Sequence, residues 1–425
     1  MNEKYFKLSI GQLKENVTEF QGKVQEGLKK KMDEKPQLLC IPTYIVPNKQ
    51  IKNARVLVLD LGGTNYRAAV VDFVNGQPVI HPKDGFSKNL SKEMKRETPP
   101  YTEKELFGEI ANLIEGLDLK GVDSIGYCFS YPADSGLNGD AELLHWTKGV
   151  NIPEMPGRQV GKPLLDYLNA NKEIKKKTKF TRIRVINDTV AALFSGLTDV
   201  KSQAHIGLIV GTGTNMATFM TSKNVSKLGK NFDKNLDLPI NLESGNFRPK
   251  HLTVIDDKVD RGSDNRGRQR FEKAVSGMYL GEIMKYVFSC DEFDEDFDAR
   301  RLTYIMNYPH MHKSEYVRAA RQIYVRSAKL VASSLAGLIL ELVTQSKDKK
   351  ITDVRLIAEG SLFWSEDRKG KNYKDLVLAE LHILLEEFGQ KNITIHVDKT
   401  DNANLIGSAI AALSHTVEDL KKEKK

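Results

Sequence analysis

The sequence predicts a layered α/β fold with an internal duplication. Patterns typical of strands alternate with patterns typical of helices along the chain, as in sheets covered by helices. A unit of strand, glycine turn and strand occupies residues 55–73, and a second such unit follows at residues 206–221, about 150 residues downstream. The chain has 425 residues, about twice the length of a typical domain, so we expect two domains.

The spacing of apolar residues places the individual elements. Residues 11–32 carry apolar side chains at intervals of three and four, which predicts an amphipathic helix. Related patterns predict helices at residues 103–117, 190–197, 317–343, 375–388 and 404–413. Strands are predicted at residues 55–60, 66–73, 124–129, 182–186, 206–210, 215–221, 354–358 and 393–397.

Composition and charge limit the classes of function. Hydrophobic residues make up 40% of the chain and charged residues 28%, as in globular proteins. The net charge is +8, but the lysine runs are scattered and lack interleaved aromatic residues, so we predict no nucleic-acid partner. The most apolar stretch, residues 330–343, contains Glu341 and is shorter than the ~20 residues of a membrane span. It predicts a buried helix, and we expect no membrane association.

Cysteine and histidine usage indicates the compartment. Cys40, Cys128 and Cys290 are too widely spaced for a disulfide framework or a metal knuckle. The histidines show no metal-ligand spacing, and His310 and His312 are predicted to lie on a surface loop. The first twenty residues lack the apolar core of a secretory signal. We therefore predict a cytoplasmic location and no structural metal.

The two glycine turns predict a phosphate site. They read Leu-Gly-Gly-Thr-Asn at residues 61–65 and Gly-Thr-Gly-Thr at residues 211–214. Neither is a GxxxxGK[ST] loop, and Met216 stands where a dinucleotide fingerprint needs its third glycine. Glycines let the backbone approach a ligand, and the threonines add hydroxyl donors. Asp60, at the end of the first strand, suits Mg²⁺ held through water. Two ordinary hairpin turns are the alternative interpretation.

Six segments, taken together, are similar to motifs of the hexokinase family. They are LDLGGTNYR at residues 59–67, FSYP at 129–132, WTKG at 146–149, INDT at 186–189, GLIVGTGTN at 207–215 and EGS at 359–361. Their order and approximate spacing follow the family from about Ile41 to Gly407. The first motif occurs across the wider actin-like superfamily, whereas the WTKG segment is typical of hexokinases.

The resemblance implies two duplicated ribonuclease-H-like domains around a deep cleft, with the sugar between them and ATP at its mouth. The small domain would comprise residues 54–186 and about 404–425, and the large domain residues 1–53 and 187–403. Closure of such a cleft would keep water away from the transferred phosphoryl group.

Asp188 resembles the family's catalytic base. It follows a predicted strand at the start of a predicted helix, where a carboxylate is favoured and could accept the proton of the sugar hydroxyl. A plain helix N-cap is the alternative. Lys148 resembles the lysine that reaches both the sugar and the transferring phosphate, a role that suits a compact ammonium group.

The resemblance also assigns the binding residues. The sugar-binding positions are Ser130, Thr147, Lys148, Asn187, Asp188, Asn215, Glu243 and Glu272. The positions for ATP and Mg²⁺ are Asp60, Gly62, Gly63, Thr64, Asn65, Arg67, Gly211, Thr212, Gly213, Gly360 and Ser361. For Glu272, an exposed glutamate on a helix is the alternative interpretation. Glu359, residues 403–407 and the loop at residues 133–144 depart from the family pattern.

The resulting hypothesis is an ATP-dependent hexokinase that phosphorylates the 6-hydroxyl of a hexose, glucose first, as a monomer or homodimer. Two alternatives stay open. One is a kinase of the same fold for fructose, mannose or an amino sugar, and the other is a non-catalytic sugar sensor.

Overall fold

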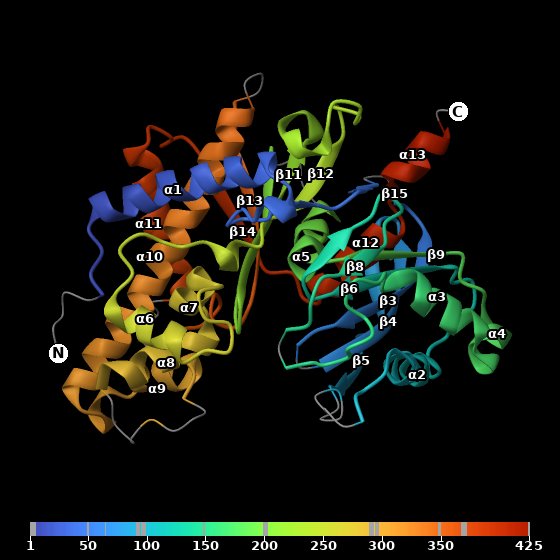
Figure 1. Cartoon of the computed structure of the whole chain (residues 1–425), viewed down its shortest axis with the longest axis horizontal. Coiled ribbons are helices and arrows are strands. Elements are labelled where there is room, and N and C mark those ends of the chain that lie inside the picture. Colours follow the sequence, from blue (N-terminus) through green and yellow to red (C-terminus); the bar gives the residue numbers. More distant parts are fainter. Residues whose placement is uncertain are drawn as a thin grey trace. The chain divides into compact units, whose positions relative to one another are not determined.

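The computed structural model divides the chain into two compact units (Figure 1). Unit 1 comprises Met1–Cys40, Ser202–Lys234 and Leu242–Lys399, and unit 2 comprises Ile41–Lys201, Asn235–Asn241 and Thr400–Lys425. The structure describes residues 6–48, 51–63, 65–90, 94, 99–147, 149–198, 203–288, 293, 297–346, 350–366 and 372–423.

A five-stranded sheet in the order β5-β4-β3-β6-β9 forms the centre of unit 2. Its strands are β3 (Ala54–Leu61), β4 (Asn65–Val74), β5 (Gln77–Asn89), β6 (Ser124–Phe129) and β9 (Arg182–Ile186). The strands β3, β4 and β5 form an antiparallel meander, whereas β6 and β9 continue the sheet in parallel with β3. The carboxyl ends of β3, β6 and β9 therefore meet at one edge of the sheet.

Helices and short strands complete unit 2. The helices are α2 (Glu103–Ile114), α3 (Gly161–Ala170), α4 (Lys172–Lys177), α5 (Asp188–Ser195), α12 (Ala403–Ala412) and α13 (Val417–Glu423), with a 3-10 turn at Gly196–Thr198. The short strands pair as β1 (Ile41–Pro42) with β12 (Asp237–Asn241), β2 (Ile45–Val46) with β15 (His415–Thr416), and β7 (Ala133–Ser135) with β8 (Ala141–Leu143).

Close packing of α12 holds α5 in place. A Cβ atom on Gly407 would lie 1.9 Å from the Ala191 carbonyl oxygen of α5, and one on Gly126 of β6 would lie 2.1 Å from the Ser408 carbonyl oxygen. Only glycine allows these backbones to approach so closely. The start of α5, which carries Asp188, is thereby fixed against the sheet.

The strands of unit 1 lie in the order β11-β10-β13-β14. They are β10 (Ala204–Val210), β11 (Thr214–Thr221), β13 (Asp353–Glu359) and β14 (Thr394–Asp398). The pair β10–β11 is antiparallel, and β13 and β14 follow in parallel with β10. Unit 2 shows the same succession of a hairpin and two parallel strands, which confirms the predicted duplication.

The helices of unit 1 are α1 (Ile10–Lys29), α6 (Val254–Arg261), α7 (Arg270–Val275), α8 (Gly277–Phe288), α9 (Ala299–Asn307), α10 (Ser314–Gln345) and α11 (Tyr373–Glu387). Its 3-10 turns are η2 (Met32–Glu34), η5 (Ser222–Asn224), η6 (Ser226–Leu228), η7 (Ser244–Asn246) and η8 (Pro309–Met311).

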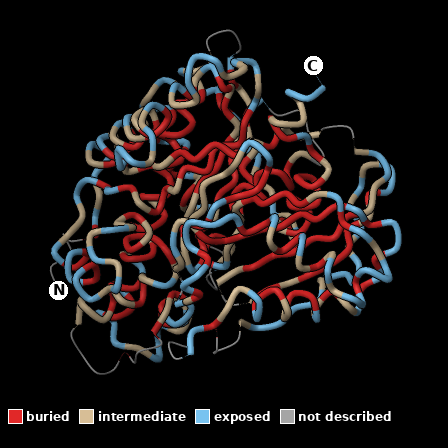
Figure 2. Tube along the Cα trace, turned by 45° about the vertical axis from the view of Figure 1, so that its right-hand side comes forward, coloured by how far each residue is buried: buried red, intermediate tan, exposed pale blue. Residues whose placement is uncertain are grey.

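By length and composition α10 could cross a membrane, but 83% of its most apolar window is buried inside the structure, as predicted for a core helix. Buried residues gather along the strands, and exposed residues along outer loops and helix faces (Figure 2).

All the predicted helices and strands are confirmed to within a few residues. Several elements were not predicted from the sequence: the strand β5, the short strands β1, β2, β7, β8, β12 and β15, and the helices α3, α4, α6 to α9 and α13. The compact units also differ in extent from the predicted domains, because residues 41–53, 187–201, 235–241 and 400–403 group with unit 2. For the second segment the reason is the contact of α5 with α12. Of the two histidines predicted on the surface, His310 is exposed but His312 is half-buried, and Cys290 lies outside the described residues.

Candidate active site

The predicted site residues fall in both units, and each group is described by itself. Unit 2 contains Asp60, Gly62, Gly63, Asn65, Arg67, Ser130, Thr147, Asn187 and Asp188, and unit 1 contains Asn215, Glu243, Glu272, Gly211, Thr212, Gly213, Gly360 and Ser361. Lys148 and Thr64 lie outside the described residues.

Asp60 ends β3 as a buried carboxylate that is only 5% exposed. Arg67, directly opposite on β4, donates to its Oδ2 atom from Nη2 at 2.6 Å and from Nε at 3.1 Å. Asn404, at the start of α12, donates to the same oxygen at 3.4 Å. The other oxygen, Oδ1, is buried, and no nitrogen or oxygen of the described residues donates to it. Oδ2 of Asp60 is therefore held by Arg67 and Asn404, and the carboxylate also forms a hydrogen bond with the Cys128 thiol.

The sheet register places Asp60 close to Asp188. Asp60 lies beside Cys128 of β6, and Cys128 lies beside Ile186 of β9, two residues before Asp188. Burial, followed by the negative charges of Asp60 and Asp188, raises the pKa of the Cys128 thiol well above its usual value. Because ligands of parallel sheets bind at the carboxyl ends of strands, the two carboxylates occupy the expected edge.

Asp188 is the first residue of α5, and its predecessor Asn187 is the N-cap. The Asn187 side chain accepts a hydrogen bond from the Thr189 N–H at 2.9 Å, which is the capping contact. Asp188 also accepts from this N–H at 2.8 Å, and the helix N-terminus favours its negative charge. The alternative that Asp188 is simply the N-cap is wrong, because Asn187 occupies that position.

The first glycine turn is tied to its neighbours through the backbone. The Gly62 N–H donates to the Asn65 carbonyl oxygen at 3.0 Å, and the Tyr131 hydroxyl donates to the Gly62 carbonyl oxygen at 2.9 Å. The Ser130 N–H donates to the Leu61 carbonyl oxygen at 3.1 Å, so the buried Ser130 lies next to the turn.

The remaining sugar position of unit 2, Thr147, is half-buried beside the aromatic pair Tyr131 and Trp146, whose ring centroids are 4.8 Å apart. A small cavity borders Asn187, but its volume of about 10 Å³ has room for no more than one water molecule. This cavity is too small for a sugar.

In unit 1 the second glycine turn lies against the Gly360 turn. Their strands β10 and β13 are parallel neighbours, so both turns leave the sheet at the same edge. A Cβ atom on Gly360, where φ is +105°, would lie 2.3 Å from the Val210 carbonyl oxygen, and one on Gly211 would lie 3.1 Å from the Gly360 Cα atom. The structure thus brings Gly211, Thr212 and Gly213 together with Gly360 and Ser361.

The three sugar positions of unit 1 gather at the start of β11. The Asn215 side chain accepts hydrogen bonds from the N–H groups of Met216 at 2.8 Å and Ser244 at 3.0 Å. Glu243 directly precedes η7 in the left-handed conformation, with φ of +53°. From α7, the Glu272 carboxylate accepts from the Thr214 N–H at 3.0 Å. Glu272 is half-buried, so the alternative of an exposed helix glutamate is wrong.

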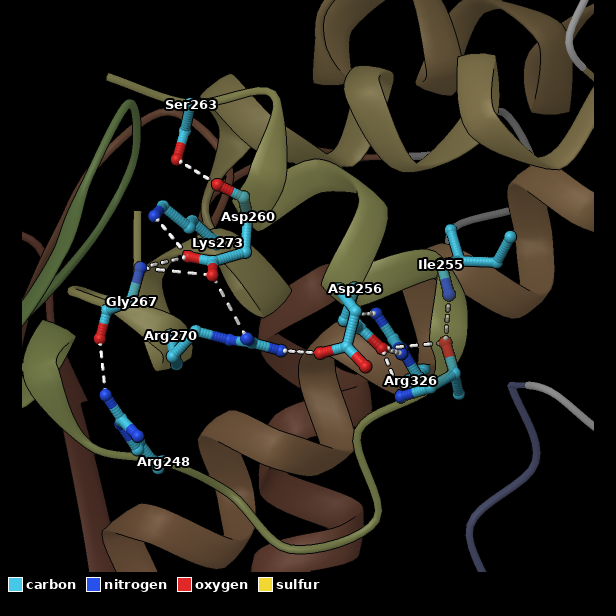
Figure 3. A network of polar contacts seen from close by, with 11 residues as sticks. Arg248, Ile255, Asp256, Asp260, Ser263, Gly267, Arg270, Lys273 and Arg326 are labelled. Carbon is cyan, nitrogen blue, oxygen red and sulfur yellow. Dashed lines mark hydrogen bonds and ion pairs between the residues drawn. The ribbon is translucent and has the colours of Figure 1, made fainter. Parts of the chain in front are cut away.

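Several charged residues around this group were not predicted as important. Asp256 and Asp260 of α6, Lys273 of α7 and Arg326 of α10 are all less than 9% exposed and form ion pairs (Figure 3). The spacing of four between the two aspartates, which places them on one helix face, was the available signal.

Asn402 and Asn404, which contact Arg67 and Asp60, were also missed. Among the described residues no group of histidine, cysteine and acidic side chains could hold a metal by itself.

Comparison with known proteins agrees with this arrangement. Two family models, both described as Hexokinase, match residues 2–197 and 205–290, together more than half of the chain. Hexokinase-2 of Rattus norvegicus is 32% identical over 294 residues, which are 66% of this chain and 30% of the rat protein. A glucokinase of Aspergillus niger is 33% identical over 321 residues, covering 66% of this chain and 61% of that protein. The matched region therefore spans less than two thirds of these relatives.

A solved structure matches over nearly the whole chain. Hexokinase from Schistosoma mansoni, in complex with glucose, aligns with a TM-score of 0.76 and 26% identity, covering 96% of each chain. The predicted α/β fold of the hexokinase type is thereby confirmed.

Proposed function

We propose that this chain, which belongs to the hexokinase family, transfers the γ-phosphoryl group of Mg-ATP to the 6-hydroxyl of a hexose, with glucose as the first substrate. The observation that carries the proposal is the position of Asp188. It lies at a helix N-terminus beyond the carboxyl end of β9, in electrostatic reach of Cys128 together with Asp60. A second carboxylate is thus available for the metal while Asp188 serves the sugar.

In this reaction Asp188 accepts the proton that leaves the 6-hydroxyl as its oxygen attacks phosphorus. The carboxylate lies at the N-terminus of α5, and α12 holds this helix against the sheet. Asn187 orients the start of the helix through its cap. Lys148 remains our candidate for the charge that contacts both sugar and phosphate.

Asp60 fits a site for Mg²⁺. This cation prefers carboxylate oxygens and keeps part of its water shell, and the buried Oδ1 atom of Asp60 offers such an oxygen. Arg67 and Asn404 fix the carboxylate from the other side. When bound, the ion would neutralise charge on the phosphate oxygens.

The nucleotide is proposed to use the glycine turns. Residues 62–65 and 211–213 would receive phosphate through backbone N–H groups, and Gly360 and Ser361 would lie on the adenosine side. The proposed sugar contacts are Ser130, Thr147, Asn187, Asn215, Glu243 and Glu272, whose donors and acceptors suit a ring with several hydroxyl groups. A cytoplasmic location and a monomeric or homodimeric state also remain proposals.

The test is ADP release with Mg-ATP in the presence of glucose, fructose, mannose, glucosamine or N-acetylglucosamine. We expect a sugar-dependent rate with glucose, and a decrease in kcat of about 10²- to 10⁴-fold in Asp188→Ala. Asp166→Ala, an exposed aspartate on α3 of the same unit, is the matched control. Glucose binding without turnover in the wild type would indicate a sensor, and a preference for another sugar would reassign the substrate.

A further inference from the structure

The helix α7, which carries Glu272, is too short to be stable without tertiary contacts. The six residues of α7 begin after Gln269, whose backbone is left-handed with φ of +50° and whose side chain makes no capping hydrogen bond. Isolated helices of this length are unstable in water, because nucleation is costly and few hydrogen bonds follow. The direction of α7, and with it the position of Glu272, must therefore come from tertiary contacts.

Asp260 of α6 supplies a group of polar contacts to α7. Its carboxylate accepts hydrogen bonds from Lys273 Nζ at 2.7 Å, from Arg270 Nη1 at 3.3 Å, and from the Gly267 N–H at 3.0 Å to each oxygen. Lys273 also donates to the Asn265 carbonyl oxygen at 3.0 Å. One carboxylate thus fastens both the helix α7 and the loop that leads into it (Figure 3).

The helix α6 is itself held by a buried ion pair. Arg326 of α10 donates from Nη1 and Nη2 to the two oxygens of Asp256 at 2.8 and 2.7 Å, and the two side chains are only 1% and 3% exposed. Such a two-bond contact fixes orientation as well as distance. The long core helix α10 therefore helps to hold α6 through this ion pair, and α6 helps to hold α7, which also packs against α8 and α10.

This series of contacts ends at Glu272. Its neighbours Phe271 and Lys273 are buried, with 0% and 2% exposure, so α7 has little freedom to rotate. In this orientation Glu272 Oε2 accepts from the Thr214 N–H. A Cβ atom on Gly213 would lie 2.7 Å from Glu272 Oε2, so the fit is close. A small rotation of α7 would displace the carboxylate from the turn.

We propose that Asp260 is a positioning residue for Glu272, and that its ion pair with Lys273 sets the affinity of the chain for the hexose. A buried ion pair is often no more stabilising than an apolar pair of similar volume, whereas it does define one geometry. A role in positioning α7 gives a reason for a buried ion pair, rather than apolar side chains, between α6 and α7. The inference rests on the proposed function, because it assigns Glu272 to the sugar.

The test is a double-mutant cycle on glucose affinity. The variants are Asp260→Asn, Glu272→Gln and the two combined, and Asp375→Asn is the control, since Asp375 lies on α11 of the same unit and its side chain is 53% exposed. We expect Asp260→Asn to raise KM for glucose about tenfold, with KM for ATP changed less than twofold. Because Asp260 acts through Glu272, the double variant should be no worse than Glu272→Gln alone.

Two results would overturn the inference. One is a folded Asp260→Asn protein whose KM for glucose stays within twofold of wild type. The other is a double variant in which the two effects multiply, which would make Asp260 independent of Glu272. If Asp260→Asn does not fold, Arg270→Gln is the second variant, and it removes the ion pairs of α7 with both Asp260 and Asp257. It should raise KM for glucose about threefold, and an unchanged KM would also contradict the inference.

Failure of the proposed function would look different. In that case the wild-type chain itself would release no ADP with any hexose and would bind no glucose by calorimetry. There would then be no sugar affinity for Asp260 to set, and both proposals would fall. A wild type that binds and phosphorylates glucose, combined with an unaffected Asp260→Asn variant, overturns only the positioning role.

Discussion

The two glycine turns obtain their carboxylates in different ways. The turn of unit 2 follows Asp60, which ends the preceding strand and pairs with Arg67 only seven residues further along the chain. The turn of unit 1 follows Ile209 and Val210, and its carboxylate, Glu272, comes from a helix 58 residues away. The first arrangement is made by one hairpin, whereas the second depends on the packing of three helices.

The largest effect is expected where that packing is broken. Asp256→Asn leaves the buried Arg326 without its full counter-charge and should lower the free energy of unfolding by about 3–5 kcal/mol. Urea denaturation checks this. The matched control is Asp166→Asn, which removes an exposed ion pair and should cost less than about 1 kcal/mol. If the two variants lost the same free energy of unfolding, the buried ion pair of unit 1 would contribute no more than the exposed pair of unit 2.

Asp60→Asn tests the local arrangement. Loss of the charge should lower kcat/KM for Mg-ATP by about 10- to 100-fold, because the amide is a weaker partner for a hydrated metal ion. Asp72→Asn is a close control, since Asp72 forms the other cross-strand pair of the same hairpin with Arg55, at 3.3 Å. Steady-state kinetics at varied ATP should separate the two variants, and a similar decrease in both would argue against a role of Asp60 in metal binding.

Glu272→Gln tests the carboxylate supplied by tertiary packing. The amide keeps the size of the side chain but loses charge-assisted hydrogen bonding, so KM for glucose should rise about tenfold. Measurement at saturating ATP isolates this effect. Glu282→Gln on the neighbouring helix α8 should leave KM for glucose unchanged. An effect on KM for ATP alone would move Glu272 from the sugar to the phosphate side.

The smallest expected effect is in the dependence of stability on pH. In unit 1, burial acts to raise the pKa of Asp256, but the charge and hydrogen bonds of Arg326 outweigh it and leave the pKa below the usual 3.8. Its contribution to stability is then complete above about pH 4 and is lost as the pH falls through the lowered value. In Asp256→Asn, stability should therefore decrease less steeply on acidification.

Asp140 of unit 2 should behave in the opposite way. Burial raises its pKa, although it accepts hydrogen bonds from the N–H groups of Ala141, Gly161 and Lys162. A raised pKa disfavours the folded state as the pH increases through the usual value, so acidification recovers stability at this site. Asp140→Asn should lose stability more steeply than wild type as the pH falls through the raised pKa toward the usual 3.8. If the curves of both variants ran parallel to that of wild type, both assignments would be contradicted.

Sequence reasoning was most successful where apolar periodicity is regular. It was less successful at β5, whose Pro78 and Pro82 argue against a strand, although an edge strand tolerates them. The helix α6 was missed because its buried face carries Asp256 and Asp260 where an apolar stripe is expected. In both cases the local pattern is unfavourable, and a partner elsewhere in the structure makes it acceptable.

Local sequence patterns were enough to predict the order of most strands and helices, to locate the two glycine turns, and to place Asp60 and Asp188 at strand ends. These features depend on neighbours within a few residues, because strand and helix periods are properties of the local backbone. The contact of Glu272 with Thr214, and that of Arg326 with Asp256, 70 residues away, became visible in the folded structure alone. An ion pair between distant segments leaves no periodic pattern in either of them. Its geometry is set by the packing of the helices that carry it.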